Sequence, residues 1–186
     1  MNNLTIIVLT LNEEIDLPRC LASLVGFGEL VVVDSGSTDQ TKEIAISHNV
    51  TFLEHPFEAF GAQRNWALDQ LPSKSPDDWI MFLDADEVAT HDFRLAVEQA
   101  IANAPIDVSG FFCCWKMLLN GVWLKNSDNF PKWQVRLIRN QCLRFIDVGH
   151  GQKEGTVIGR LEFLREPYLH FGFSKGWTAW IDRHNR

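Results

Sequence analysis

The feature that most constrains the fold is a regular alternation of short apolar runs and helix-forming segments through the first half of the chain. Apolar runs at 4–9, 30–33, 51–53 and 79–83 predict four strands. They are too continuously apolar to leave one face in water, as is typical of a parallel sheet covered on both sides. The segments between and after them predict helices at 18–25, 41–48, 59–71 and 90–103. This order predicts a three-layer α/β fold.

Two helix starts carry local signals. Ser37–Gln40 has the pattern of a capping box that opens the second helix. Thr90 is placed to cap the fourth helix with its hydroxyl.

The pattern changes after Val108. Runs at 111–117, 133–138, 143–146 and 168–171 predict strands, Asn120-Gly121 and Asn140-Gln141 predict turns, and 175–186 predicts a helix. We therefore expect one domain over residues 1–186, with a mostly parallel half at about 1–108 and a smaller mixed or antiparallel half at about 109–186. Since no Gly or Pro ends the last helix, we expect the natural chain to continue beyond Arg186.

Charge is divided unevenly between the two halves. Residues 1–109 carry 5 Lys/Arg and 18 Asp/Glu, whereas residues 110–186 carry 12 and 6. The acidic front half argues against nucleic-acid binding. The basic back half also holds five of the seven tryptophans, which suits an anionic interface such as lipid headgroups or phosphorylated glycans. The alternative is an ordinary charged surface over an aromatic core.

Compartment signals favour the cytosol. No apolar run approaches the ~18 residues of a membrane span, and the N-terminus lacks the pattern of a secretion signal. The four cysteines include no CxxC pair, which predicts reduced thiols.

Polar residues follow three of the predicted strands. They begin at Thr10, Asp34 and Asp84. In open α/β sheets ligands bind outside the carboxyl ends of the strands, so we expect these residues to converge on one edge. Asp84 and Asp86 form an Asp-x-Asp pair whose hard oxygens suit Mg²⁺ or Mn²⁺, with coordination positions left for diphosphate oxygens. Each motif alone also has a purely structural interpretation, as a cap or a solvated turn.

Four ordered motifs resemble those of the family-2 inverting glycosyltransferases of the GT-A fold. They are Ile7–Glu14, Val33–Asp39, Gly61–Asn65 and Phe82–Glu87. The chain is most similar to the bacterial branch that contains the lipopolysaccharide-core β-glucosyltransferases, which shows a run like Lys132–Arg139 and a late histidine like His170. The resemblance implies transfer of a sugar from a nucleotide sugar, with a UDP-sugar favoured, to a cell-envelope glycan or glycolipid. The reaction would take place in the cytosol or at the cytoplasmic face of the inner membrane.

The resemblance also implies roles for individual residues. Asp34 would contact the nucleoside, and Arg64 would lie on the sugar-phosphate side. Asp84 would face the ribose or sugar, and Asp86 would bind the metal directly. The implied donor-binding set is Thr10, Asn12, Glu13, Asp34, Ser37, Arg64 and Asp84, and the implied metal set is Asp86, Asp84 and His170.

Inversion needs a base that takes the proton of the acceptor hydroxyl. This branch usually has a carboxylate directly after a histidine, but here Gly151 follows His150. Glu154, Asp147 and His150 itself remain candidates, and Glu154 is our choice.

A non-catalytic nucleotide- or glycan-binding module of the same fold is the alternative function. The departure at Gly151 favours this alternative, whereas retention of both Asp84 and Asp86 favours the enzyme.

A second hypothesis concerns the last helix, where Trp177 and Trp180 lie near basic residues and would contact a membrane surface.

Overall fold

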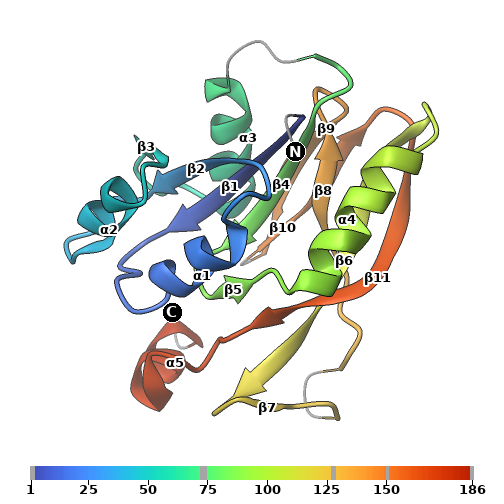
Figure 1. Cartoon of the computed structure of the whole chain (residues 1–186). Helices are drawn as coiled ribbons and strands as arrows, with labels where there is room; N and C mark the ends of the chain where they lie inside the picture. Colours follow the sequence, from blue (N-terminus) through green and yellow to red (C-terminus); the bar gives the residue numbers. More distant parts are fainter. Residues whose placement is uncertain (1–2, 72–74, 127–128, 150, 185–186) are drawn as a thin grey trace.

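The computed structural model of the chain describes residues 3–71, 75–126, 129–149 and 151–184, with side chains as far as Ile181 (Figure 1). Its elements, in chain order, are β1 (Leu4–Thr10), α1 (Leu17–Leu24), β2 (Glu29–Asp34), α2 (Thr41–Ser47), β3 (Thr51–Glu54), α3 (Phe60–Gln70), β4 (Trp79–Asp84), β5 (Glu87–Val88), α4 (His91–Asn103), β6 (Val108–Leu119), β7 (Val122–Trp123), β8 (Gln134–Arg139), β9 (Leu143–Val148), β10 (Gly151–Val157), β11 (Arg160–His170) and α5 (Gly176–His184).

One sheet runs through both halves of the chain. Within the described ranges its strand order is β3-β2-β1-β4-β8-β6-β11-β5, and β7 pairs with the far end of β6. The strands β3, β2, β1 and β4 are parallel, whereas β8 is antiparallel to both of its neighbours, β4 and β6. The predicted mostly parallel first half and mixed second half are therefore both present.

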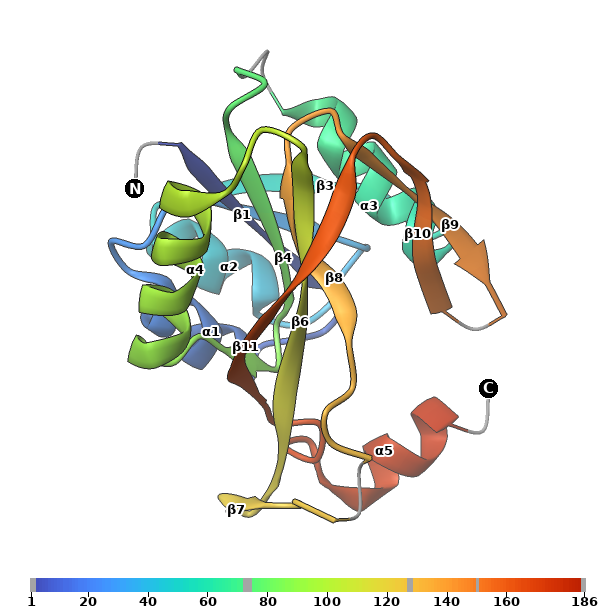
Figure 2. The ribbon, with the colours of Figure 1, turned by 90° about the vertical axis from the view of Figure 1, so that its right-hand side faces the viewer.

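Helices and a hairpin cover the two faces of the sheet. Figure 2 shows α1, α2 and α4 on one face, and α3 with the β9–β10 hairpin on the other. Along β1, Ile6 and Val8 pack into the core under the first group, and Ile7 packs into the core under the second. Burial on both faces explains why the strand is apolar at nearly every position. The predicted α/β fold with three layers is confirmed.

Of the two predicted helix caps, the one before α4 is correct and the one before α2 is wrong. Thr90 caps α4, since its Oγ1 accepts a hydrogen bond from the Phe93 N–H at 3.1 Å. The capping box before α2 does not form. Ser37 turns instead toward Asp34, and the Asp39 carboxylate accepts from the Thr41 N–H at 3.0 Å.

The turns were predicted better than the short strands. Asn120 and Gly121 both adopt positive φ at the β6–β7 turn, as an Asn-Gly hairpin requires. Strand β10 was missed because its sequence, GQKEGTV, lacks a run of β-branched or aromatic residues. Its pairing with β9 builds the hairpin that stands beside α3.

Candidate active site

Three neighbouring strand ends bring the polar motifs of the first half to one edge of the sheet. β1 lies between β2 and β4, and the register pairs Thr10 with Asp34 and Leu9 with Asp84. Because these strands are parallel, their carboxyl ends meet there. The expected convergence of the three motifs is therefore what the structure shows.

Asp34 organises the loop that follows β2. Its Oδ1 accepts hydrogen bonds from the hydroxyls of Thr10 (2.7 Å) and Ser37 (2.5 Å). Its Oδ2 accepts from the backbone N–H groups of Gly36 (2.9 Å) and Ser37 (2.7 Å). With only 2% of the residue exposed, Asp34 fixes the wall of the site from inside the protein.

The loop after β1 is bound to the loop after β2. The Asn12 N–H donates to Ser37 Oγ at 2.7 Å, and Asn12 Oδ1 accepts from the Thr38 N–H at 2.8 Å. The Glu13 N–H donates to Thr41 Oγ1 at 2.7 Å. Asn12 has a φ of 55°, a left-handed conformation that Asn tolerates better than most residues. Asn12 and Ser37 thus form one rigid surface.

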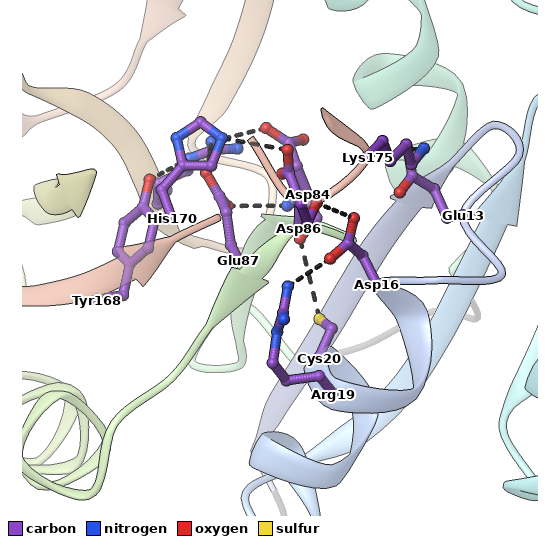
Figure 3. A network of polar contacts seen from close by, with 12 residues as sticks. Glu13, Asp16, Arg19, Cys20, Asp84, Asp86, Glu87, Tyr168, His170 and Lys175 are labelled. Carbon is purple, nitrogen blue, oxygen red and sulfur yellow. Dashed lines mark hydrogen bonds and ion pairs between the residues drawn. The ribbon is translucent and has the colours of Figure 1, made fainter. Parts of the chain in front are cut away.

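The segment that follows β11, near the C-terminus, contacts the loop that follows β1 (Figure 3). Lys175 Nζ donates to the carbonyl of Asn12 at 2.6 Å and pairs with Glu13 Oε1 at 2.7 Å. Ser174 Oγ donates to Asp16 Oδ2 at 2.5 Å. Burial raises the pKa of Glu13 to about 7, although the Lys175 ammonium acts in the opposite direction.

Asp84 is held by two buried guanidinium groups. Arg64 Nη2 lies 3.2 Å from Oδ1, and Arg136 Nη2 lies 2.9 Å from Oδ2. Desolvation alone would raise the pKa of Asp84, but the two arginines hold it well below its usual range. The Arg64 and Arg136 side chains are 2% and 3% exposed, whereas that of Asp84 is 40% exposed. Arg64 therefore acts on the site through Asp84, and the carboxylate itself faces the opening.

Asp86 meets His170, from the end of β11. His170 Nε2 lies 3.3 Å from Asp86 Oδ2, and the Phe171 N–H donates to the Asp86 carbonyl at 2.8 Å. Burial acts against a charged imidazole, but the Asp86 carboxylate outweighs it and raises the pKa of His170 to about 9. Figure 3 shows both side chains beside Asp84.

A buried network supports this turn. Arg136 Nη2 also lies 2.6 Å from Glu87 Oε1, and its Nε donates to Tyr168 Oη at 3.2 Å. Glu87 Oε2 in turn accepts from the Asp84 N–H at 2.8 Å. Burial raises the pKa of Glu87 to about 7, with Arg136 opposing the shift. The roles of Arg136, Glu87 and Tyr168 are not among those predicted from the sequence. For Arg136, the sequence signal is a charged residue between the apolar residues of β8.

The metal set Asp86, Asp84 and His170 stays a prediction. Among the residues that the structure describes, no group of three or more His, Cys, Asp or Glu side chains is arranged to hold an ion. Both oxygens of Asp84 face arginines, which leaves Asp86 and His170 as the pair of donors. Neighbouring ligands of an octahedral ion at 2.0–2.1 Å lie ~3 Å apart, so the 3.3 Å separation of this pair fits such an ion.

The candidates for the base lie on or beside the β9–β10 hairpin. Asp147 Oδ1 accepts from the Gly61 N–H at 2.6 Å, so this carboxylate ties the hairpin to the start of α3. Glu154 is half-buried on β10, opposite Phe145 of β9. His150 lies outside the described residues.

Comparison with known proteins agrees with this geometry. Residues 5–150 match the family described as Glycosyl transferase family 2. The chain is 29% identical over 159 residues to the lipopolysaccharide core biosynthesis glycosyltransferase LpsC of Rhizobium meliloti (strain 1021), an alignment that covers 83% of this chain and 57% of LpsC. It is 28% identical over 104 residues to the uncharacterized glycosyltransferase RT0209 of Rickettsia typhi (strain ATCC VR-144 / Wilmington), covering 55% and 34%.

Solved structures show the same fold. S. aureus TarS 1–349 superposes with a TM-score of 0.63 at 19% identity, over 92% of this chain and 61% of that one. TarS 1–349 in complex with UDP-GlcNAc superposes with a TM-score of 0.50 at 26% identity, over 66% and 36%.

The fold and the matched motifs therefore define a GT-A glycosyltransferase domain. The chain belongs to glycosyl transferase family 2. It spans 57% or less of the length of the curated relatives named above.

Proposed function

We propose that this chain transfers a sugar from a nucleotide sugar to an acceptor hydroxyl, with inversion at the anomeric carbon and with Mn²⁺ or Mg²⁺ bound at Asp86 and His170. The observation that carries the proposal is the approach of His170 Nε2 to Asp86 Oδ2 at 3.3 Å, beside the clamped Asp84. A UDP-sugar is the favoured donor, which is supported by the likeness to TarS in complex with UDP-GlcNAc.

Donor binding would use the edge formed by β1, β2 and β4. The loops joined by Asn12 and Ser37 offer a rigid wall for the nucleoside. Asp84 is ionised and fixed by two arginines, and its side chain is 40% exposed, so the lone pairs that the arginines leave can accept hydrogen bonds from ribose or sugar hydroxyls. Arg64 thereby contributes by orienting Asp84.

The leaving group would depart from the side of Asp86 and His170. A divalent cation held there would neutralise charge on the diphosphate as it leaves. Carboxylate oxygens suit both Mg²⁺ and Mn²⁺, and the imidazole of His170 favours the softer Mn²⁺. In the absence of a cation, His170 carries the positive charge opposite Asp86, consistent with its pKa of about 9.

Glu154 is our choice for the base. Asp147 is committed to the Gly61 N–H, which makes it a support for the hairpin. Glu154 lies on the adjacent strand and is half-buried. His150 stays the alternative.

The acceptor would be a cell-envelope glycoconjugate such as lipopolysaccharide core. The 29% identity to LpsC supports this acceptor class. We infer that residues 1–108 bind the donor and residues 109–186 face the acceptor, within a single domain 1–186.

We further propose a cytoplasmic enzyme that touches the inner membrane surface through α5. Phe173, Trp177 and Trp180 form an aromatic cluster with ring centroids 4.9–6.2 Å apart, and Trp177 is 57% exposed. Aromatic rings suit the headgroup region of a bilayer. No helix in the described ranges is long and apolar enough to cross a membrane. Co-sedimentation with anionic vesicles should fall in Trp177→Ala, and equal sedimentation would contradict the contact.

A donor-hydrolysis screen tests the main proposal. Nucleotide sugars are incubated with the protein and Mn²⁺ or Mg²⁺, and release of the nucleoside diphosphate is measured. We expect hydrolysis of one donor class, its loss in Asp86→Ala and retention in Asp92→Asn, which alters an exposed carboxylate on α4. Binding of the nucleoside diphosphate without hydrolysis of any donor or transfer would favour the non-catalytic module.

Glu154→Gln separates the candidates for the base. We expect this variant to bind the nucleoside diphosphate normally and to lose turnover. Unchanged turnover would move the role to His150 or Asp147.

A further inference from the structure

An aromatic pocket lies apart from the residues used above. It encloses about 370 Å³. Its lining residues are Cys114, Phe130, Pro131, Trp133, Phe163 and Arg165. Ligand sites are typically concave and mostly apolar with a few polar groups, and this pocket combines three aromatic rings with one guanidinium.

The ring of Phe163 contacts two other aromatic rings and is partly exposed. Its ring stacks on Phe112, with centroids 5.0 Å apart and an interplanar angle of 22°, and Trp133 meets it edge-on at 4.9 Å and 81°. Phe163 is nevertheless 55% exposed in the middle of β11. A ring fixed by two neighbours loses little conformational freedom when a ligand covers its remaining face.

The pocket lies on the face of the sheet that α3 and the β9–β10 hairpin cover. Phe112, on which Phe163 stacks, packs against the core under α3 and the β9–β10 hairpin. Figure 2 shows that hairpin and α5 on this side of β6, β8 and β11. The pocket and the candidate active site are built in part by one segment, since Trp133 lines the pocket and Arg136, three residues later, clamps Asp84.

One exposed cation lines the pocket and can pair with an anion. This cation is Arg165, Lys132 precedes Trp133 in the sequence, and the Glu166 carboxylate acts on the Cys114 thiol of the lining. The half of the chain that builds the pocket carries twice as many Lys and Arg as Asp and Glu, 12 against 6. A planar guanidinium is well suited to phosphate or carboxylate oxygens.

We propose that this pocket binds a pyranose ring that carries an anionic substituent, with the apolar face of the ring on Phe163 and the anion on Arg165. The inference rests on the proposed function in one respect, since it makes the pocket the subsite for the acceptor. A phosphorylated sugar and a uronic acid share the required chemistry.

Saturation-transfer NMR on the wild-type chain tests the pocket directly. The probes are glucose 6-phosphate, glucuronate and methyl glucoside, and inorganic phosphate, which has no C–H protons to observe, is added as a competitor. We expect signal on the ring protons of an anionic sugar and weaker signal for methyl glucoside. Phosphate should reduce the signal of the anionic sugars but not that of methyl glucoside. The stronger of the two anionic sugars identifies the substituent.

Three variants of the pocket and two controls outside it locate the signal. Phe163→Ala and Phe163→Leu should each weaken sugar binding, the first by about tenfold, because the flat apolar contact is lost. Arg165→Gln should reduce the anionic sugars to the level of methyl glucoside. Ile106→Ala and Arg160→Gln, which alter exposed side chains outside the pocket, should match the wild type.

The outcome is independent of donor binding. UDP titrations with Mn²⁺ on the same proteins should be unaffected by the pocket variants. If the wild type binds the sugars but does not bind UDP, the proposed function is overturned and the pocket proposal stands. Absence of sugar signal in the wild type, or equal signal in wild type and both Phe163 variants, would overturn the pocket.

Discussion

Asp86 and His170 are 84 residues apart in the sequence, and their side chains meet at 3.3 Å. The backbone sets this meeting, because β5 pairs with β11 so that His170 lies opposite Glu87, the residue after Asp86. The Phe171 N–H and the Asp86 carbonyl extend the same ladder. The pair is therefore positioned by the sheet before any ligand binds, which is the kind of rigid support that a precise site needs.

Arg136 should be essential to the stability of this turn. Arg136→Met leaves Asp84 and the buried Glu87 without their shared cation, and breaking such a buried pair typically costs about 3–5 kcal/mol. We expect a corresponding fall in the free energy of unfolding, measured by urea denaturation. Arg144→Met is the control, since Arg144 and Asp69 form an exposed ion pair worth about 0–1 kcal/mol. Equal effects of the two substitutions would contradict the network.

Asp147 should act as a support and not as the base. Asp147→Ala removes the acceptor for the Gly61 N–H, so we expect a loss of about 1 kcal/mol in stability, as for a lost helix cap. Asp147→Asn keeps an oxygen at that position and should retain both stability and donor hydrolysis. A fully stable Asp147→Asn protein without turnover would show that Asp147 is the base.

Glu13 should give stability a defined pH dependence. Its pKa is about 7 in the folded chain and 4.5 in the reference state, so the folded chain holds a proton that the unfolded chain releases between these values. The resulting stabilisation is complete below pH 4.5 and is lost as pH rises through 7, with a magnitude on the order of 3 kcal/mol.

The measurement compares wild type with Glu13→Gln. Urea denaturation across this pH window should show the free energy of unfolding falling more steeply with pH in the wild type than in the variant. Glu87 titrates in the same direction in both proteins, so the difference between them isolates Glu13. If the free energy of unfolding depends on pH in the same way in both proteins, the pKa of about 7 for Glu13 is excluded.

The convergence of the three polar motifs at one edge of the sheet could be predicted because its signals are local. Each buried strand is a continuous apolar run, and the polar residue that ends it, such as Thr10, Asp34 or Asp84, must lie at the carboxyl edge of a parallel sheet. The order of the strands in the sheet, β3-β2-β1-β4, was not predicted.

The contacts across the site were not predictable in the same way. Ser37 fits a local capping pattern, but the carboxylate of Asp34 and the N–H of Asn12 bind its hydroxyl in the folded chain. The partners of Arg136 lie 49 and 52 residues away, so no local pattern reveals them. Long-range ion pairs of this kind depend on which strands become neighbours.

The most direct test of the central claim is Mn²⁺ binding in the presence of UDP, measured by electron paramagnetic resonance. We predict that the wild type and Asp92→Asn bind Mn²⁺, and that Asp86→Asn and His170→Ala each bind it at least about tenfold more weakly, a loss that even outer-sphere partners of a metal can cause. Equal Mn²⁺ affinity in the wild type, Asp86→Asn and His170→Ala would contradict the assignment of this pair as the cation site.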